Sequence, residues 1–176
     1  MLDPDTKDWT WVLERPCPAC GFDASCCEPA TIAGLVRDNA DTWKELLAAK
    51  LIGAGRPDEG TWSSLEYACH VRDVYLRYDA RLVLMLTSED PLFPNWDQDA
   101  TAVEERYEEQ APEIVVDDLR TAALAIAARL DGLAEQQWRR PGRRSDGASF
   151  TIASICRYMV HDPIHHVWDV MQAAAD

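Results

Sequence analysis

The chain has 176 residues, enough for one domain with its own core, and 47% hydrophobic and 27% charged residues are ordinary values for a globular protein. A formal net charge of −14 argues against anionic partners, namely nucleic acid and an acidic membrane surface. No apolar run approaches the roughly 20 residues of a membrane span, and the acidic start MLDPDTKDWTW lacks the apolar segment of a secretory signal, so we expect a cytoplasmic protein.

The first segment, residues 1–28, carries two tryptophans and four cysteines without a helical period. We expect it to form an irregular arm laid across the domain. Within it, the run from Cys17 to Gly21 reads CPACG, the C-P-x-C-G form of a metal-binding knuckle. A closed zinc or iron site needs four ligands and usually two such knuckles, and the sequence contains one.

The remaining cysteines of the arm are poor partners for this knuckle. Cys26 and Cys27 are adjacent, and adjacent cysteines seldom bind one tetrahedral ion comfortably. A redox dithiol is disfavoured, because Gly21 opposes the helix start that would lower the pKa of the first thiol. We therefore expect free thiols in a packed arm, with an additional metal site at Cys17 and Cys20 as the alternative.

Four segments have the amphipathic period of helices. Pro29 suits the first turn of the first helix, and Ser63 with Glu66 predicts a capping box at the start of the second. Thr151 is placed to cap the fourth. The helices are expected at residues 29–50, about 63–86, about 112–136 and 151–171. No strand pattern appears, so we predict an all-α fold, a four-helix bundle over residues 29–176 preceded by the cysteine-rich arm 1–28.

Two connections between these helices stand out. The segment 87–111 contains two prolines, with a short helix expected near 101–107, and connections of this length often form lids. The segment 139–147, read as a loop, gathers four arginines and is the one local site suited to a small anionic ligand. Arg143 and Arg144 are its candidate cofactor-binding residues.

The run HDPIHH holds three of the four histidines of the chain. His161 and His165 are spaced to share one helical face about 6 Å apart, so both rings can reach one cation. His166 is expected to point elsewhere. Pro163 has two interpretations: it kinks a continuous helix, or Asp162 and Pro163 begin a new helix, which would set His161 off the shared face.

The fourth histidine, His70, lies on the second predicted helix. The helical faces around all three candidate ligands are mostly polar, and such faces normally meet solvent, which is the alternative to a shared metal site. Asp73, Asp169 and Glu66 are suited to orient ring N–H groups beside a metal. Glu66 is equally suited to its capping box.

The segment WSSLEYACH, residues 62–70, followed near the C-terminus by His161-x3-His165, resembles the DinB-like superfamily of four-helix bundles. The resemblance extends over roughly residues 30–171. It implies a divalent metal, zinc or nickel foremost, held by His70, His161 and His165 with coordination positions left open. Relatives include S-transferases that use mycothiol, bacillithiol or glutathione, and a thiol bound to such a metal becomes a thiolate nucleophile.

These observations lead to a metal-dependent thiol S-transferase as the leading hypothesis, with the metal activating a thiol or water. The electrophile would enter beneath the 87–111 connection, and Tyr158 and Asp73 are the candidate catalytic side chains. The expected partners are a small-molecule electrophile and a thiol, with no nucleic acid or membrane; a homodimer is one option for the assembly. The alternatives are a non-catalytic metal-binding or stress-response protein on the same fold, and an interaction protein whose functional part is the cysteine knuckle.

Overall fold

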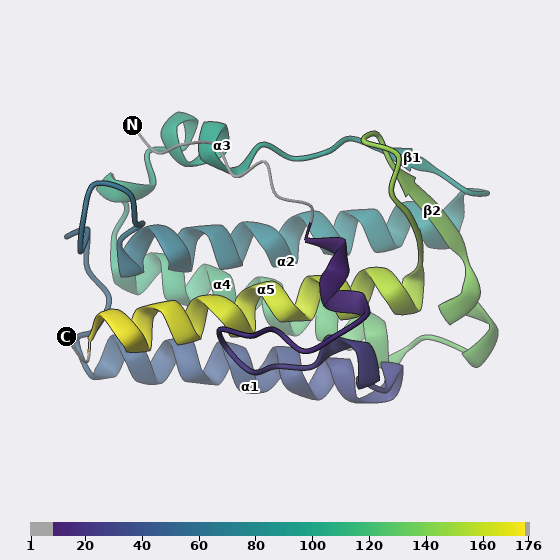
Figure 1. Ribbon diagram of the computed structural model, residues 1–176, viewed down its shortest axis with the longest axis horizontal. Coiled ribbons are helices and arrows are strands. Elements are labelled where there is room, and N and C mark those ends of the chain that lie inside the picture. The colour runs from purple at the N-terminus through teal and green to yellow at the C-terminus, as the bar shows by residue number, and fades with distance from the viewer. Residues whose placement is uncertain (1–8, 175–176) are drawn as a thin grey trace.

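Four long helices lie side by side in the computed structural model, which describes residues 9–174 (Figure 1). They are α1 (Pro29–Ala48), α2 (Ser64–Thr87), α4 (Pro112–Asp131) and α5 (Ile152–Ala173). Helix α1 packs against α4 and α5, and α2 packs against the same two helices. The predicted four-helix bundle is confirmed.

The helix starts follow the sequence signals. The Ser63 hydroxyl accepts a hydrogen bond from the Glu66 N–H, and the Glu66 carboxylate accepts one from the Ser63 N–H, which completes the capping box. The same carboxylate also binds the guanidinium of Arg56. Glu66 is therefore committed to the start of α2. At α5 the Thr151 hydroxyl accepts from the Ser154 N–H, as predicted.

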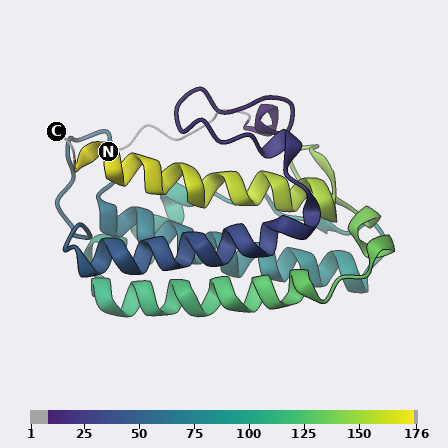
Figure 2. The same cartoon turned by 90° about the horizontal axis from the view of Figure 1, so that it is seen from below.

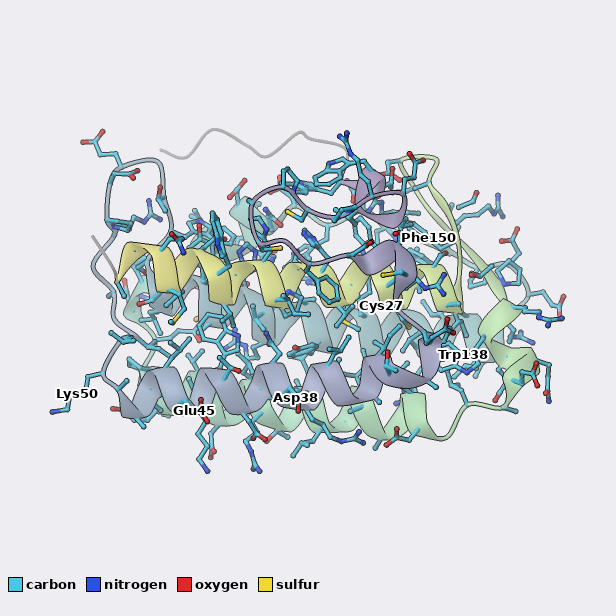
Figure 3. The ribbon with its side chains drawn as sticks, turned by 60° about the horizontal axis from the view of Figure 1, so that its bottom comes forward. Cys27, Asp38, Glu45, Lys50, Trp138 and Phe150 are labelled. Carbon is cyan, nitrogen blue, oxygen red and sulfur yellow. The ribbon has the colours of Figure 1, made fainter. Side chains whose placement is uncertain are left out.

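The core lies between the four helices. Large side chains such as Trp43, Tyr75 and Ile126 are fully buried there, and burial of this kind supplies most of the driving force for folding. On the outer side of α1, Asp38 and Glu45 point into solvent, away from the arm that lies over α5 (Figure 3). The apolar face of each helix is thus buried and its polar face is exposed, as the sequence period predicts.

Helix α5 continues without interruption through Pro163. Of the two interpretations, the structure therefore shows one continuous helix rather than a new helix that begins at Asp162 and Pro163. The Asn39 side-chain amide of α1 donates to the Pro163 carbonyl at 2.9 Å, and the Tyr75 hydroxyl of α2 donates to the Asn39 amide oxygen at 2.8 Å. This buried chain of hydrogen bonds ties α5 to both neighbours at the middle of the HDPIHH run.

A small sheet closes one end of the bundle and was not expected from the sequence. Strands β1 (Leu92–Phe93), β2 (Pro141–Arg144) and β3 (Ser149–Thr151) pair in that order, β1 with β2 in parallel and β2 with β3 antiparallel. The segment 139–147, expected as a loop, therefore contains a strand. Strands of two to four residues are too short to show an alternating pattern.

Strand β2 lies directly on α2. A Cβ atom at Gly142 would come 2.9 Å from the Cγ of Met85, so only glycine leaves room for this close approach. The pairing of β1 with β2 fixes one end of the long connection between α2 and α4. The rest of that connection holds α3 (Gln98–Glu104) and the 3₁₀ turn η3 (Tyr107–Glu109), and it returns along α2 (Figure 1).

The described part of the arm contains two 3₁₀ turns, η1 (Thr10–Leu13) and η2 (Ala24–Cys26). Both turns contact α5, and the arm covers the outer side of that helix, as predicted (Figure 2). Within residues 9–174, no helix combines the length and the apolar character needed to cross a membrane.

Candidate metal centres

A cavity of about 940 Å³ lies between the arm, α2, α5, the β2–β3 hairpin and the connection that follows α2. Four polar side chains of α5 border it in two i, i+4 pairs, His161 with His165 and Asp162 with His166. Its other walls include Trp9 of the arm, Tyr78 and Arg81 of α2, Trp96 of the connection and Arg144 of β2. The polar side chains of α5 therefore face a partly open cavity large enough for a small molecule.

Potential metal ligands form two groups in the described part of the chain. In each group one donor atom per residue lies within 4.8 Å of every other. The first group is His70, Asp162 and His166, and the second is Cys17, Cys20, His161 and His165.

The first group joins α2 to α5. The Nε2 atom of His70 lies 3.1 Å from the Oδ1 atom of Asp162, and the Nε2 atom of His166 lies 3.5 Å from the same oxygen. The other ring nitrogen of His166, Nδ1, is 2.8 Å from a carboxylate oxygen of Asp169. One carboxylate oxygen thus faces two imidazole nitrogens, and a second carboxylate orients one of the rings.

Aromatic rings enclose this group. The ring of Trp96 stacks on His70 with centroids 5.0 Å apart and planes inclined by 11°, and Trp62 lies 5.2 Å from the same ring. Tyr67 stacks on His166 at 4.6 Å. His70 is fully buried, and its Nδ1 atom has no hydrogen-bond partner among the described residues. The ring nitrogen of His70 that is available to bind a metal beside Asp162 is therefore Nε2.

The second group joins the arm to α5. The Sγ atom of Cys17 lies 3.5 Å from Nδ1 of His165, and the Sγ atom of Cys20 lies 3.8 Å from Nε2 of His161. Cys17 and His161 are buried, and the other two residues are half-buried. Asp169 reaches this group too, because its Oδ1 atom is 3.7 Å from Nε2 of His165.

Electrostatics differ between the groups. Burial alone would raise the pKa of Asp162, but the adjacent His70 and His166 outweigh it and hold the pKa of this carboxyl well below its usual range. Burial, helped by His165, lowers the pKa of His161 to about 4, so the ring is neutral at pH 7, the form that binds metals. Burial raises the pKa of Cys20 to about 11, which argues against a redox dithiol.

The structure groups the histidines differently from the sequence-based expectation. His161 and His165 do share a face, but that face meets the cysteines of the arm, whereas His70 meets Asp162 and His166. The reason is the helical turn of about 100° per residue, which places the 162/166 pair on the face next to the 161/165 pair. The proposed set of His70, His161 and His165 is therefore divided between two groups.

The sequence signal for the missed ligands was present. Asp162 and His166 have the same i, i+4 spacing as the predicted pair His161 and His165. A tetrahedral site at Cys17 and Cys20 needs two more ligands. His161 and His165 of α5 are in position to supply them, 141 and 148 residues away along the chain. Cys26 and Cys27 instead direct their thiols to the Asp23 carbonyl, so they do not complete the knuckle.

Asp73 and Tyr158, the candidate catalytic side chains, have different surroundings. The Asp73 carboxylate accepts hydrogen bonds from the Tyr107 hydroxyl at 2.5 Å and from Arg72 at 2.8 Å, which is a packing role. Tyr158 borders the cavity, and its hydroxyl lies 3.4 Å from a guanidinium nitrogen of Arg144. Their catalytic roles stay predictions.

The two candidate cofactor-binding arginines, Arg143 and Arg144, have different positions relative to the cavity. Arg144 borders the cavity and pairs with Asp146, and its guanidinium carbon lies 5.4 Å from the centre of the Tyr158 ring. Arg143 is exposed and pairs with Asp90 at 2.9 Å. Of these two arginines, Arg144 alone is thus in a position to meet a molecule inside the cavity.

Comparison with known proteins agrees with this architecture. No curated protein sequence matches the chain. Among solved structures, the chain is similar to YfiT from Bacillus subtilis, described as a probable metal-dependent hydrolase with an unusual four-helix bundle topology, with a TM-score of 0.73 and 18% identity over 84% of this chain and 87% of that one. The model of the DinB superfamily matches residues 53–170, more than half of the 176 residues, and the chain therefore belongs to the DinB superfamily.

Proposed function

We propose that this protein is a divalent-metal-dependent enzyme whose ion is held by His70, Asp162 and His166. One observation carries the proposal. The Nε2 atoms of His166 and His70 converge on one carboxylate oxygen of Asp162, at 3.5 Å and 3.1 Å, and the Asp169 carboxylate lies 2.8 Å from the Nδ1 atom of His166. Two imidazoles and a carboxylate from two helices are thus directed at one point, with a second carboxylate beside one ring, which is the arrangement of protein sites for divalent metals.

The donor set fits such an ion. Two imidazoles and one carboxylate are the protein ligands of catalytic zinc and of non-haem iron sites, which keep positions open for water or substrate. Asp162 and His166 border the cavity, so an incoming molecule can approach from there. Trp62 and Trp96 cover the ring of His70 and keep water from that side. A divalent ion bound here would lower the pKa of a coordinated thiol or water and so supply the nucleophile at neutral pH.

For the nucleophile, we propose the thiol of a low-molecular-weight cosubstrate such as mycothiol, bacillithiol or glutathione. The thiolate sulfur would attack an electrophilic carbon, a C–S bond would form, and the leaving group would depart with its electron pair while the thiol proton passes to solvent. Arg144, with Tyr158 beside it, borders the same cavity and would hold an anionic part of the cosubstrate. The electrophile would enter beside Trp96, on the connection that follows α2.

A second candidate is hydrolysis, with water in the place of the thiol. It is favoured by the fold shared with YfiT, since that protein is described as a probable metal-dependent hydrolase. Both reactions need the same ion and the same open coordination position. They differ in whether a thiol is consumed.

The test is an assay of the zinc- or nickel-loaded protein with each of the three thiols and monochlorobimane, beside ester and amide substrates without thiol. We expect thioether formation at least about 100-fold faster than with the chelator-treated protein. Metal-dependent hydrolysis of the ester or amide substrates without thiol would contradict S-transfer and support the second candidate, hydrolysis. Equal rates with and without metal in every arm would contradict both and leave a non-catalytic metal-binding protein.

A further inference from the structure

We propose that Cys17, Cys20, His161 and His165 form a second metal site, for zinc, which fastens the N-terminal arm to α5. The distances match this ion. With Zn–S bonds of about 2.3 Å and Zn–N bonds of about 2.0–2.1 Å, a tetrahedral site separates neighbouring sulfur and nitrogen ligands by about 3.6 Å. The distance from Sγ of Cys17 to Nδ1 of His165 is 3.5 Å, and that from Sγ of Cys20 to Nε2 of His161 is 3.8 Å.

The arm presents its two thiols together because of a tight turn. The Gly21 N–H donates to the Cys17 carbonyl at 2.9 Å, and the Cys17 N–H donates to the Phe22 carbonyl at 2.9 Å. Gly21 has φ of +74°, a conformation that glycine adopts without the strain of a side chain. The turn therefore directs Cys17 and Cys20 to one side, toward the 161/165 face of α5.

The surroundings are those of a closed site. His161 faces the cysteines with Nε2, and His165 faces them with Nδ1. The other ring nitrogen of His165, Nε2, faces Asp169. The rings of Trp9 and Trp11 lie over His161 with centroids 6.1 Å and 6.4 Å away. Four protein ligands under an aromatic cover fill the coordination sphere of zinc, which is typical of structural rather than catalytic sites.

A disulfide between the two cysteines explains less. It would account for the nearness of Cys17 and Cys20 but not for the two histidines that converge on them from α5. Zinc accounts for all four side chains, and thiolate with imidazole is the ligand combination it prefers. The arm also supplies Trp9, Thr10 and Leu13 to the cavity wall. Zinc at this site therefore has a further consequence, since it holds one wall of the proposed active site in place.

Cobalt(II) substitution distinguishes this site from the proposed active site, because thiolate–cobalt charge transfer absorbs in the near ultraviolet and only the second site contains cysteine. The full-length protein is reduced, stripped of metal and titrated with Co²⁺ and then Zn²⁺. We expect the thiolate band in the wild type and its bleaching by zinc. The Cys17→Ser/Cys20→Ser variant should lose the band and one zinc per chain, whereas the matched control Cys26→Ser/Cys27→Ser should keep both.

Amide hydrogen exchange supplies the structural readout. Residues 9–28 should lose protection in Cys17→Ser/Cys20→Ser while the bundle helices keep theirs; unchanged protection of the arm would contradict its fastening by zinc. Where that variant fails to fold, His165→Ala replaces it with the same expected loss of the band. A reduced wild type without the band, or a band that survives in both variants, would overturn the proposal. His70→Ala should keep the band, so failure of the proposed activity leaves this result unaffected.

Discussion

Replacement of Asp162 by asparagine is expected to remove the ion of the His70–Asp162–His166 group and to lower the metal-dependent rate at least about 100-fold. The amide keeps the shape of the side chain but not the negative charge, and two neutral imidazoles remain as ligands. The charge matters here because one oxygen of Asp162 faces the Nε2 atoms of both rings. Metal content by elemental analysis and the rate of thioether formation are the measurements.

Asp131→Asn is the matched control for this change. Asp131 is an exposed carboxylate at the end of α4 and pairs with Arg37, so the same substitution there removes a charge that belongs neither to the ligand group nor to the cavity wall. We expect its metal content and rate to equal those of the wild type. An Asp162→Asn protein with unchanged metal content and rate would remove the basis for the proposed active site.

The substitution Asn39→Leu is expected to lower the free energy of unfolding by about 2–4 kcal/mol, because it leaves two buried polar groups without their partner. Those groups are the Tyr75 hydroxyl and the Pro163 carbonyl, both of which hydrogen-bond the Asn39 amide in the wild type. Pro163 lies between the two members of each ligand pair of α5, so this network supports both groups. Urea unfolding at a fixed metal concentration measures the change.

A double-mutant cycle separates the hydrogen bond from packing. Tyr75→Phe removes the hydroxyl and keeps the ring, and in Asn39→Leu/Tyr75→Phe one of the two orphaned groups is gone. The double variant should therefore be more stable than the sum of the two single losses, by about 0.5 kcal/mol or more. Strictly additive losses would show that the two side chains do not depend on each other.

Periodicity and caps were sufficient to predict the helices. Ser63 with Glu66, and Thr151, mark helix starts through local contacts that the sequence displays within a few residues. The three short strands were missed, because their pairing depends on partners such as Leu92 and Arg143 that are far apart in the chain. Local sequence signals thus predicted the helices of the bundle, but they did not predict the long-range pairing of the strands.

The metal ligands show the same limit. The HDPIHH run contains two i, i+4 pairs, 161/165 and 162/166, and nothing local decides which pair faces α2 and which faces the arm. The packing of α2 against α5 brings His70 to the second pair, and the arm brings the CPACG turn to the first. The sequence therefore identified the residue types, while the tertiary fold determined their grouping.

The number of ions bound per chain tests most directly whether adjacent faces of α5 carry two separate metal sites. Elemental analysis should compare the wild type with His161→Ala and His166→Ala after saturation with zinc and removal of the excess. We expect two ions in the wild type and one in each variant, with the thiolate–cobalt band lost only in His161→Ala. A single ion in the wild type that both variants lose alike would contradict two sites and indicate one shared centre.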